Sequence, residues 1–162
     1  MPVTPRDWSD PFLEQAKADL NVAWSINPEL RGSTFCMLLQ MVFEKIAKAF
    51  YTRSGQTVPR THKVASHLFQ ILLRHPKSST LLPNSNVEQF IQELELAHPS
   101  LAGRQTPVWP QLEYPWEESG FIYYPERDLS LVKRVSNPKD RIALDCLKFA
   151  SAMIDQIKII IP

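Results

Sequence analysis

Hydrophobic residues recur at helical spacing in five separate segments of this chain. In the clearest segment, residues 35–52, apolar residues three and four positions apart form one continuous face, and polar residues line another: Gln40, Glu44, Lys48 and Thr52. The same spacing recurs in residues 12–24, 64–72, 90–97 and 142–157. No comparably strong alternating pattern indicates a sheet. The sequence therefore predicts an all-α fold, an up-and-down bundle of four to five helices.

Capping residues and helix breakers set the expected ends of these helices. Gly55 is expected to end the second helix as its C-terminal cap, and His75-Pro76 to stop the third. Within the second helix, Glu44 and Lys48 are spaced for an i,i+4 ion pair. Four helix starts are predicted from N-cap residues, in two cases followed by proline: Asp10-Pro11, Thr61, Ser85 with Glu88 as a capping box, and Asn137-Pro138.

The composition changes in residues 98–137, which contain five prolines and six aromatic residues. Prolines at this frequency exclude a continuous helix, whereas disordered linkers are poor in aromatic residues. We therefore expect one helical domain over residues 1–162, with an ordered irregular insertion at 98–137 and a short strand pair near Phe121–Tyr124 and Leu129–Val132. The aromatic residues of 107–124 either stack nucleic-acid bases or cover the core. Packing on the core is favoured because no Lys or Arg lies between Pro107 and Phe121.

Composition and charge narrow the class of protein. The chain has 18 basic and 17 acidic residues, a formal net charge of +1, and this balance argues against tight, non-specific nucleic-acid binding. Two cysteines, Cys36 and Cys146, lie in apolar helical patterns and are expected to be reduced and buried. Two cysteines and four scattered histidines show no zinc-binding spacing, so no metal or cofactor is expected. The N-terminus does not have the pattern of a signal peptide, and no apolar run is long enough to cross a bilayer, so a cytoplasmic protein is expected, without a membrane partner.

The common catalytic motifs are missing, including a glycine-rich phosphate loop, G-x-S-x-G, H-E-x-x-H and Cys-x-x-Cys. The chemistry-bearing residues that remain are basic and imidazole side chains around the second and third helices: Lys45, Lys48, Arg53, Arg60, His62, Lys63 and His67. Lys45 and Lys48, beside Glu44, are also typical of a solvated helix face. His62 is also typical of a residue that caps the start of a helix.

These residues resemble a known family, the HEPN domains (higher-eukaryote and prokaryote nucleotide-binding domains). That family has a Glu-Lys-x-x-Lys-Ala helix, a glycine about six residues later, and a Thr-His pair opening the next helix. The final helix 143–160, rich in Ala and Ile, is also similar. The resemblance is carried mainly by residues 12–72, through Ala16, Asp19, Leu20, Phe43-Glu44-Lys45-Ile46-Ala47-Lys48-Ala49, Gly55, Pro59-Arg60-Thr61-His62 and Leu68.

The resemblance implies a helical bundle, often dimeric, that binds a nucleotide or RNA and acts beside a nucleotidyltransferase partner. Lys45, Lys48, Arg60 and His62 are then the expected phosphate-binding residues. Cleaving members use an Arg-x4-6-His motif without a metal, and here Arg60 and His67 satisfy it, seven positions apart and so able to share one helix face.

Two alternatives to a nucleotide-binding module therefore stay open. One is a metal-independent endoribonuclease that uses Arg60 and His67. The other is a non-catalytic scaffold for protein interactions. The family's Arg-Tyr-Pro segment is only partly matched, because Arg104 and Tyr114-Pro115 are split by nine residues.

Overall fold

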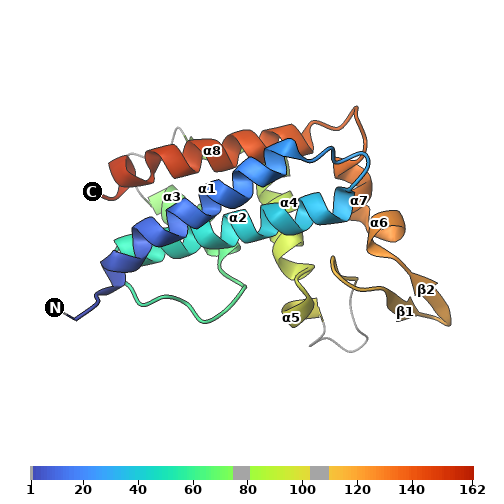
Figure 1. Ribbon diagram of the computed structural model, residues 1–162, viewed down its shortest axis with the longest axis horizontal. Helices are drawn as coiled ribbons and strands as arrows, with labels where there is room; N and C mark the ends of the chain where they lie inside the picture. Colours follow the sequence, from blue (N-terminus) through green and yellow to red (C-terminus); the bar gives the residue numbers. More distant parts are fainter. Residues whose placement is uncertain (1, 75–80, 103–109) are drawn as a thin grey trace.

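The computed structural model describes residues 2–74, 81–102 and 110–162, and it is mostly helical, with 66 % of the residues in helices (Figure 1). The predicted all-α bundle is confirmed. The described elements are η1 (Pro5–Trp8), α1 (Ser9–Ser25), α2 (Gly32–Arg53), α3 (Ala65–Arg74), α4 (Ser85–Leu96), α5 (Pro99–Ala102), β1 (Trp116–Glu118), β2 (Phe121–Tyr123), α6 (Pro125–Asp128), α7 (Ser130–Val135) and α8 (Ile142–Ile160).

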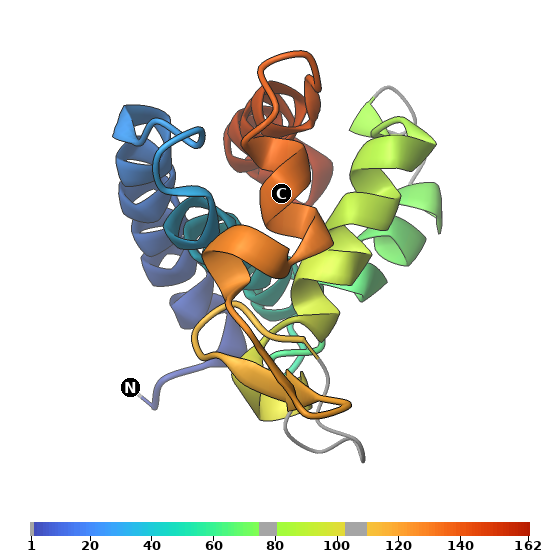
Figure 2. The ribbon, with the colours of Figure 1, turned by 90° about the vertical axis from the view of Figure 1, so that its right-hand side faces the viewer.

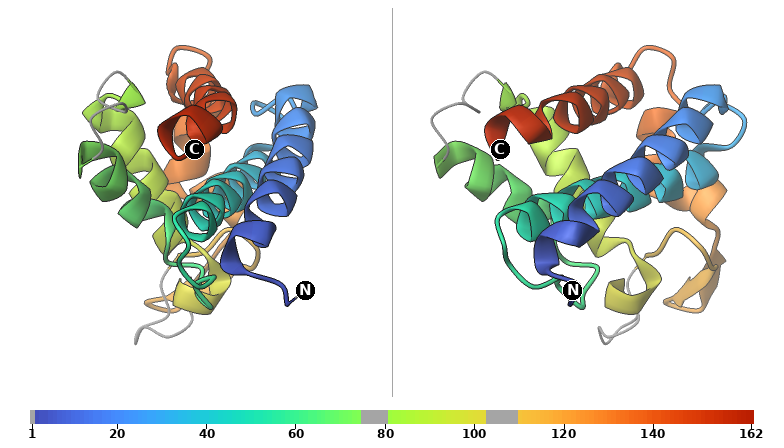
Figure 3. Two further views of the ribbon diagram at one scale, coloured as in Figure 1. Left: turned by 90° about the vertical axis from the view of Figure 1, so that its left-hand side faces the viewer. Right: turned by 60° about the vertical axis from the view of Figure 1, so that its left-hand side comes forward.

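Helix α2 is the centre of the bundle. It contacts η1, α1, α3, α4, α6, α7 and α8. Seen end-on in Figure 2, α1 (blue) lies on one side of α2 and the α3–α4 pair (green) on the other, with α8 (red) across the gap between them. Figure 3 shows the same packing from two further directions, with α4 crossing α2 steeply. Residues on several faces of α2 are therefore buried.

The central position of α2 explains a departure from its predicted polar face. Gln40 and Thr52, expected on that face, are both buried. The Thr52 hydroxyl donates to the Lys48 carbonyl at 3.0 Å, so its burial leaves no unpaired donor. The predicted Glu44–Lys48 ion pair is confirmed, with 2.7 Å between Nζ and Oε1. The apolar faces predicted for the fourth and last helices are buried as expected: Phe90, Ile91, Leu94 and Ala97, and Ile142, Cys146, Phe149, Ala150, Met153 and Ile157.

The helix ends follow the sequence rules only in part. Gly55 ends α2 as predicted: it has a φ of +78°, and the N–H groups of Gly55 and Gln56 donate to the carbonyls of Thr52 and Tyr51. A side chain at Gly55 would strain the left-handed backbone. The predicted stop at His75-Pro76 lies outside the described residues.

The four predicted helix starts are wrong by one to four residues. α1 begins at Ser9, because the turn η1, capped by Thr4 and Asp7, leads directly into it. Asn84, rather than Ser85, caps α4, and its side chain accepts from Val87 N–H at 2.9 Å. Asn137 instead forms a turn by accepting from Lys139 N–H, and α8 begins at Ile142. Thr61 likewise accepts from Lys63 N–H, four residues before α3 begins at Ala65.

Two helices receive their N-terminal caps from distant carboxylates. Glu126 accepts from the N–H groups of Gly32 and Ser33, at 2.7 and 2.8 Å, and so caps α2. Glu95, on α4 and only 2 % exposed, accepts from Ala65 N–H at 2.6 Å and Ser66 N–H at 3.3 Å, and so caps α3. Both contacts place a negative charge at a helix N-terminus, where the helix dipole stabilises it. These caps fix the starts of α2 and α3 through tertiary contacts.

The insertion predicted at 98–137 contains regular elements. β1 and β2 form an antiparallel hairpin, with Trp116 opposite Tyr123, and Ser119 and Gly120 both have positive φ at its turn. The strand predicted at Leu129–Val132 is wrong: Leu129 directly precedes α7, and the other three residues lie within that helix, which buries Leu131, Val132 and Val135. Trp109 and Arg104 lie outside the described residues.

The expected burial of both cysteines is confirmed, and it leads to a testable prediction. Cys36 and Cys146 are free thiols with 0 % exposure, and burial raises the pKa of each, so the reactive thiolate is rare at neutral pH. We expect both thiols to label slowly with a bulky reagent in the folded protein and rapidly in denaturant. Rapid labelling of Cys146 in the native state would show that α8 is not packed as described.

Within the described residues, no helix is both long enough and apolar enough to cross a membrane.

Candidate functional site

A polar network surrounds Glu44 at the middle of α2. Its Oε1 accepts from the Lys48 ammonium at 2.7 Å, and its Oε2 lies 2.8 Å from His62 Nδ1. The Gln40 amide donates to the same Oε2 at 3.3 Å. Burial alone would raise the pKa of Glu44, but the hydrogen bonds and charges of Lys48 and His62 outweigh it and lower the pKa. Glu44 is therefore ionised at neutral pH and joins α2 to the segment before α3.

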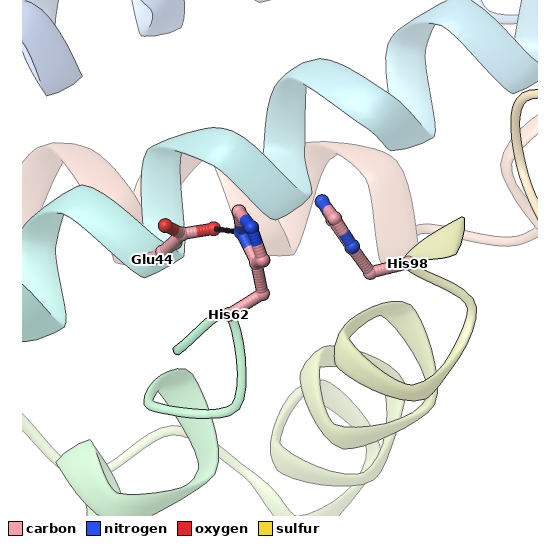
Figure 4. A group of neighbouring side chains, drawn as sticks. All are labelled: Glu44, His62 and His98. Atoms are coloured by element: carbon pink, nitrogen blue, oxygen red, sulfur yellow. Dashed lines mark hydrogen bonds and ion pairs between the residues drawn. The ribbon is translucent and has the colours of Figure 1, made fainter. Parts of the chain in front are cut away.

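His98 completes this cluster from the end of α4. Its ring lies face to face with that of His62, with 3.9 Å between centroids and 14° between planes (Figure 4). The backbone N–H of Ser100 donates to His98 Nδ1 at 3.1 Å, and the Ser100 hydroxyl lies 2.8 Å from the same nitrogen. Burial, followed by the charge of His62, lowers the pKa of His98 against the opposing effect of Glu44 and Glu113. His98 is thus neutral at physiological pH.

Three elements position these side chains. Glu44 is fixed by its place on α2, and His62 by the cap that Glu95 gives to the start of α3 three residues later. His98 follows directly after Ala97, whose carbonyl accepts from Leu112 N–H at 3.1 Å and so holds the end of α4 against the insertion. The site therefore forms only when α2, α3, α4 and the insertion are assembled.

A cavity of about 280 Å³ opens beside this cluster. Its apolar walls are Met37, Met41, Pro99 and Leu112. Its polar lining consists of Gln40, Glu44, Lys45, His62, His98 and Glu113. An apolar cavity with a few hydrogen-bonding groups at one side is the usual form of a small-ligand site.

The four predicted phosphate-binding residues do not all meet in this cavity. Lys45 and His62 line it, and Lys48 bonds to Glu44 at its wall. Lys45 is paired with Asp19 of α1, so both lysines have carboxylate partners. Arg60 lies elsewhere, in a hollow of about 390 Å³ that it shares with Trp8 and the N-terminal segment.

Arg60 and His67, the candidate nuclease pair, do not share a helix face. α3 begins at Ala65, so Arg60 lies in the bend before the helix and the predicted two-turn spacing is wrong. The His67 ring instead bonds the Tyr51 hydroxyl at 3.1 Å and lines a different hollow from that of Arg60.

Sequence reasoning missed His98. It lies 36 residues after His62, at the end of a different helix, and no local motif links the two. Glu44 was expected only as the ion-pair partner of Lys48 and as part of the family motif.

Comparison of the chain with protein-family models, with curated proteins and with solved structures finds no match.

Proposed function

We propose that this protein is a HEPN-like helical module that binds a nucleotide or RNA, and that the cavity beside Glu44 takes the nucleobase. One observation carries the proposal. Residues singled out by the family resemblance, which are spread over about forty positions of the sequence, form one connected group beside the cavity. Glu44, Lys45 and His62 line the cavity. Asp19 pairs with Lys45, and Lys48 pairs with Glu44.

The charges favour a base over a phosphate in this cavity. Lys45 and Lys48 are compensated by Asp19 and Glu44, and Glu113 adds a further carboxylate to the lining. A phosphate would lose hydration without gaining an unpaired cation, which is unfavourable. A nucleobase is neutral and planar, and it can place its faces against Met37 and Met41 and its polar edge toward Gln40.

Thermal melting with nucleosides and their 5′-monophosphates tests this proposal. A ligand that binds only the folded state stabilises it by about 2.7 kcal/mol at a hundred times Kd, or roughly 5–10 °C for a domain of this size. We expect a nucleoside and its monophosphate to give similar shifts with little salt dependence, because the phosphate stays outside the cavity.

A bulky residue at the cavity wall should remove this shift. Met41 is 39 % exposed and lines the cavity, so Met41→Arg blocks it without disturbing the core. Leu144→Arg, at a residue 36 % exposed on α8, is the matched control and should keep the shift. Arg60→Ala should leave nucleoside binding intact. A melting shift that only monophosphates give, and that is lost at high salt and in Arg60→Ala, would indicate that the ligand binds in the Arg60 hollow instead. Equal melting shifts with nucleoside in Met41→Arg and Leu144→Arg would overturn the assignment of the site to the cavity.

The exposed side chains of the hairpin favour the second candidate function, a protein-interaction scaffold. Tyr114, Phe121, Ile122 and Tyr124 are 46–67 % exposed, and apolar side chains grouped in this way are typical of interaction surfaces. If no nucleoside, nucleotide or RNA binds, the protein-interaction scaffold is the function that remains.

RNA cleavage in the presence of EDTA that is lost in His67→Ala would instead support the endoribonuclease. The dimer and the nucleotidyltransferase partner stay predictions, which size measurement and co-purification would test.

A further inference from the structure

The cluster of Glu44, His62 and His98 has the composition of a metal site. Each residue offers one ligand atom, and these atoms all lie within 4.8 Å of one another (Figure 4). We propose that the three side chains bind one divalent transition-metal ion of the zinc class at the edge of the cavity. This inference is independent of the nucleobase proposed above, because it concerns the ion alone.

The surrounding hydrogen bonds fit this role. Lys48 holds Oε1 of Glu44, which leaves Oε2 directed at His62 and able to face an ion. The Ser100 backbone N–H donates to Nδ1 of His98, so the ring proton lies on Nε2 in the metal-free protein. When Nε2 binds the ion, that proton moves to Nδ1, which gives up the Ser100 N–H bond and donates instead to the Ser100 hydroxyl, 2.8 Å away. Outer partners of this kind orient the ligands in metal sites and fix the histidine tautomer. The cluster thus has both ligands and groups that position them.

Binding also requires one ring to turn. The stacked rings present their faces to each other, whereas a metal ion is bound in the plane of each ring, about 2.0–2.1 Å from the nitrogen. The His62 side chain is 44 % exposed and lies outside any helix, so it can turn. The ion then replaces the hydrogen bond between His62 and Glu44, and any proton on the bound nitrogen leaves to solvent.

The ligand types select the class of ion. Two imidazoles and one carboxylate suit Zn²⁺, Co²⁺ and Ni²⁺, whereas Mg²⁺ and Ca²⁺ prefer oxygen ligands alone. Three protein ligands leave a fourth position for water or for the Glu113 carboxylate, which lines the same cavity.

Calorimetric titration of the EDTA-treated, dialysed full chain with Zn²⁺ tests the site, with Co²⁺ absorption as a second readout. We expect one Zn²⁺ per chain, a visible Co²⁺ spectrum with nitrogen and oxygen ligands, and no comparable binding of Mg²⁺. Glu44→Gln, His62→Gln and His98→Gln should each weaken binding by at least about tenfold, since each removes one ligand.

His67→Gln is the matched control, because His67 lies on α3 and bonds Tyr51 outside the cluster. It should bind Zn²⁺ as the unchanged protein does. Circular dichroism separates loss of binding from loss of fold in each variant. The proposal is overturned if the unchanged protein binds no stoichiometric Zn²⁺ or Co²⁺, or if folded His98→Gln binds as tightly as His67→Gln. Nucleoside binding plays no part in either result.

Discussion

Replacing Phe149 by alanine is expected to lower the free energy of unfolding by about 3–5 kcal/mol, the range for removal of a buried aromatic ring. Phe149 of α8 stacks on Phe43 of α2 and Phe69 of α3, with ring centroids 5.9 and 6.1 Å apart. The ring is 8 % exposed, so its loss removes contacts to two other helices and leaves a cavity between them.

Urea unfolding measures this effect through a lower midpoint at an unchanged slope. Ile159→Ala, on the same helix at a residue 59 % exposed, is the control and should change the free energy of unfolding by less than about 1 kcal/mol. Similar losses in the two variants would mean that α8 does not pack on α2 and α3 through Phe149.

Removing the carboxylate of Glu95 is expected to lower the free energy of unfolding by about 2–3 kcal/mol, a large effect for a polar residue. Glu95→Ala leaves the N–H groups of Ala65 and Ser66 without their acceptor inside the protein, and an unsatisfied buried donor costs about 1–3 kcal/mol. It also removes a negative charge from the N-terminus of α3. His62 lies three residues before Ala65, so the same variant should weaken the binding of any ligand or metal ion that contacts His62.

Glu93→Ala provides the matched control on α4. The Glu93 side chain is 37 % exposed and is 3.8 Å from Arg134, a pairing that contributes little. Its loss should change the urea midpoint only slightly. A cost for Glu95→Ala no greater than that for Glu93→Ala would rule out the buried cap.

The sequence predicted the helices well because each one buries a continuous apolar face. The face predicted for α8, from Ile142 to Ile157, is buried, and the Gly55 cap of α2 forms as expected. Both depend on residues within a few positions of each other. Helix starts were less predictable, since N-cap residues also form turns, as Asn137 does before α8.

The site depended on contacts that no local pattern carries. Lys45 and Lys48 could be named as candidates from the sequence. The pairing of Lys48 with Glu44 was predictable from their spacing, whereas the pairing of Lys45 with Asp19 was not, because Asp19 lies on another helix. His98 could not be named at all. Its approach to His62 requires the end of α4 to meet the segment before α3.

The sequence by itself thus determined the helical class, the clearest amphipathic helix, the Glu44–Lys48 pair and the residues of the family resemblance. These properties follow from periodicity and from spacings of three or four residues. The tertiary structure alone decided that Glu95 and Glu126 cap distant helices, that Arg60 and His67 lie apart, and that Glu44, His62 and His98 form one cluster. The physical reason is that these relations join side chains of different helices, so they exist only after the helices have packed.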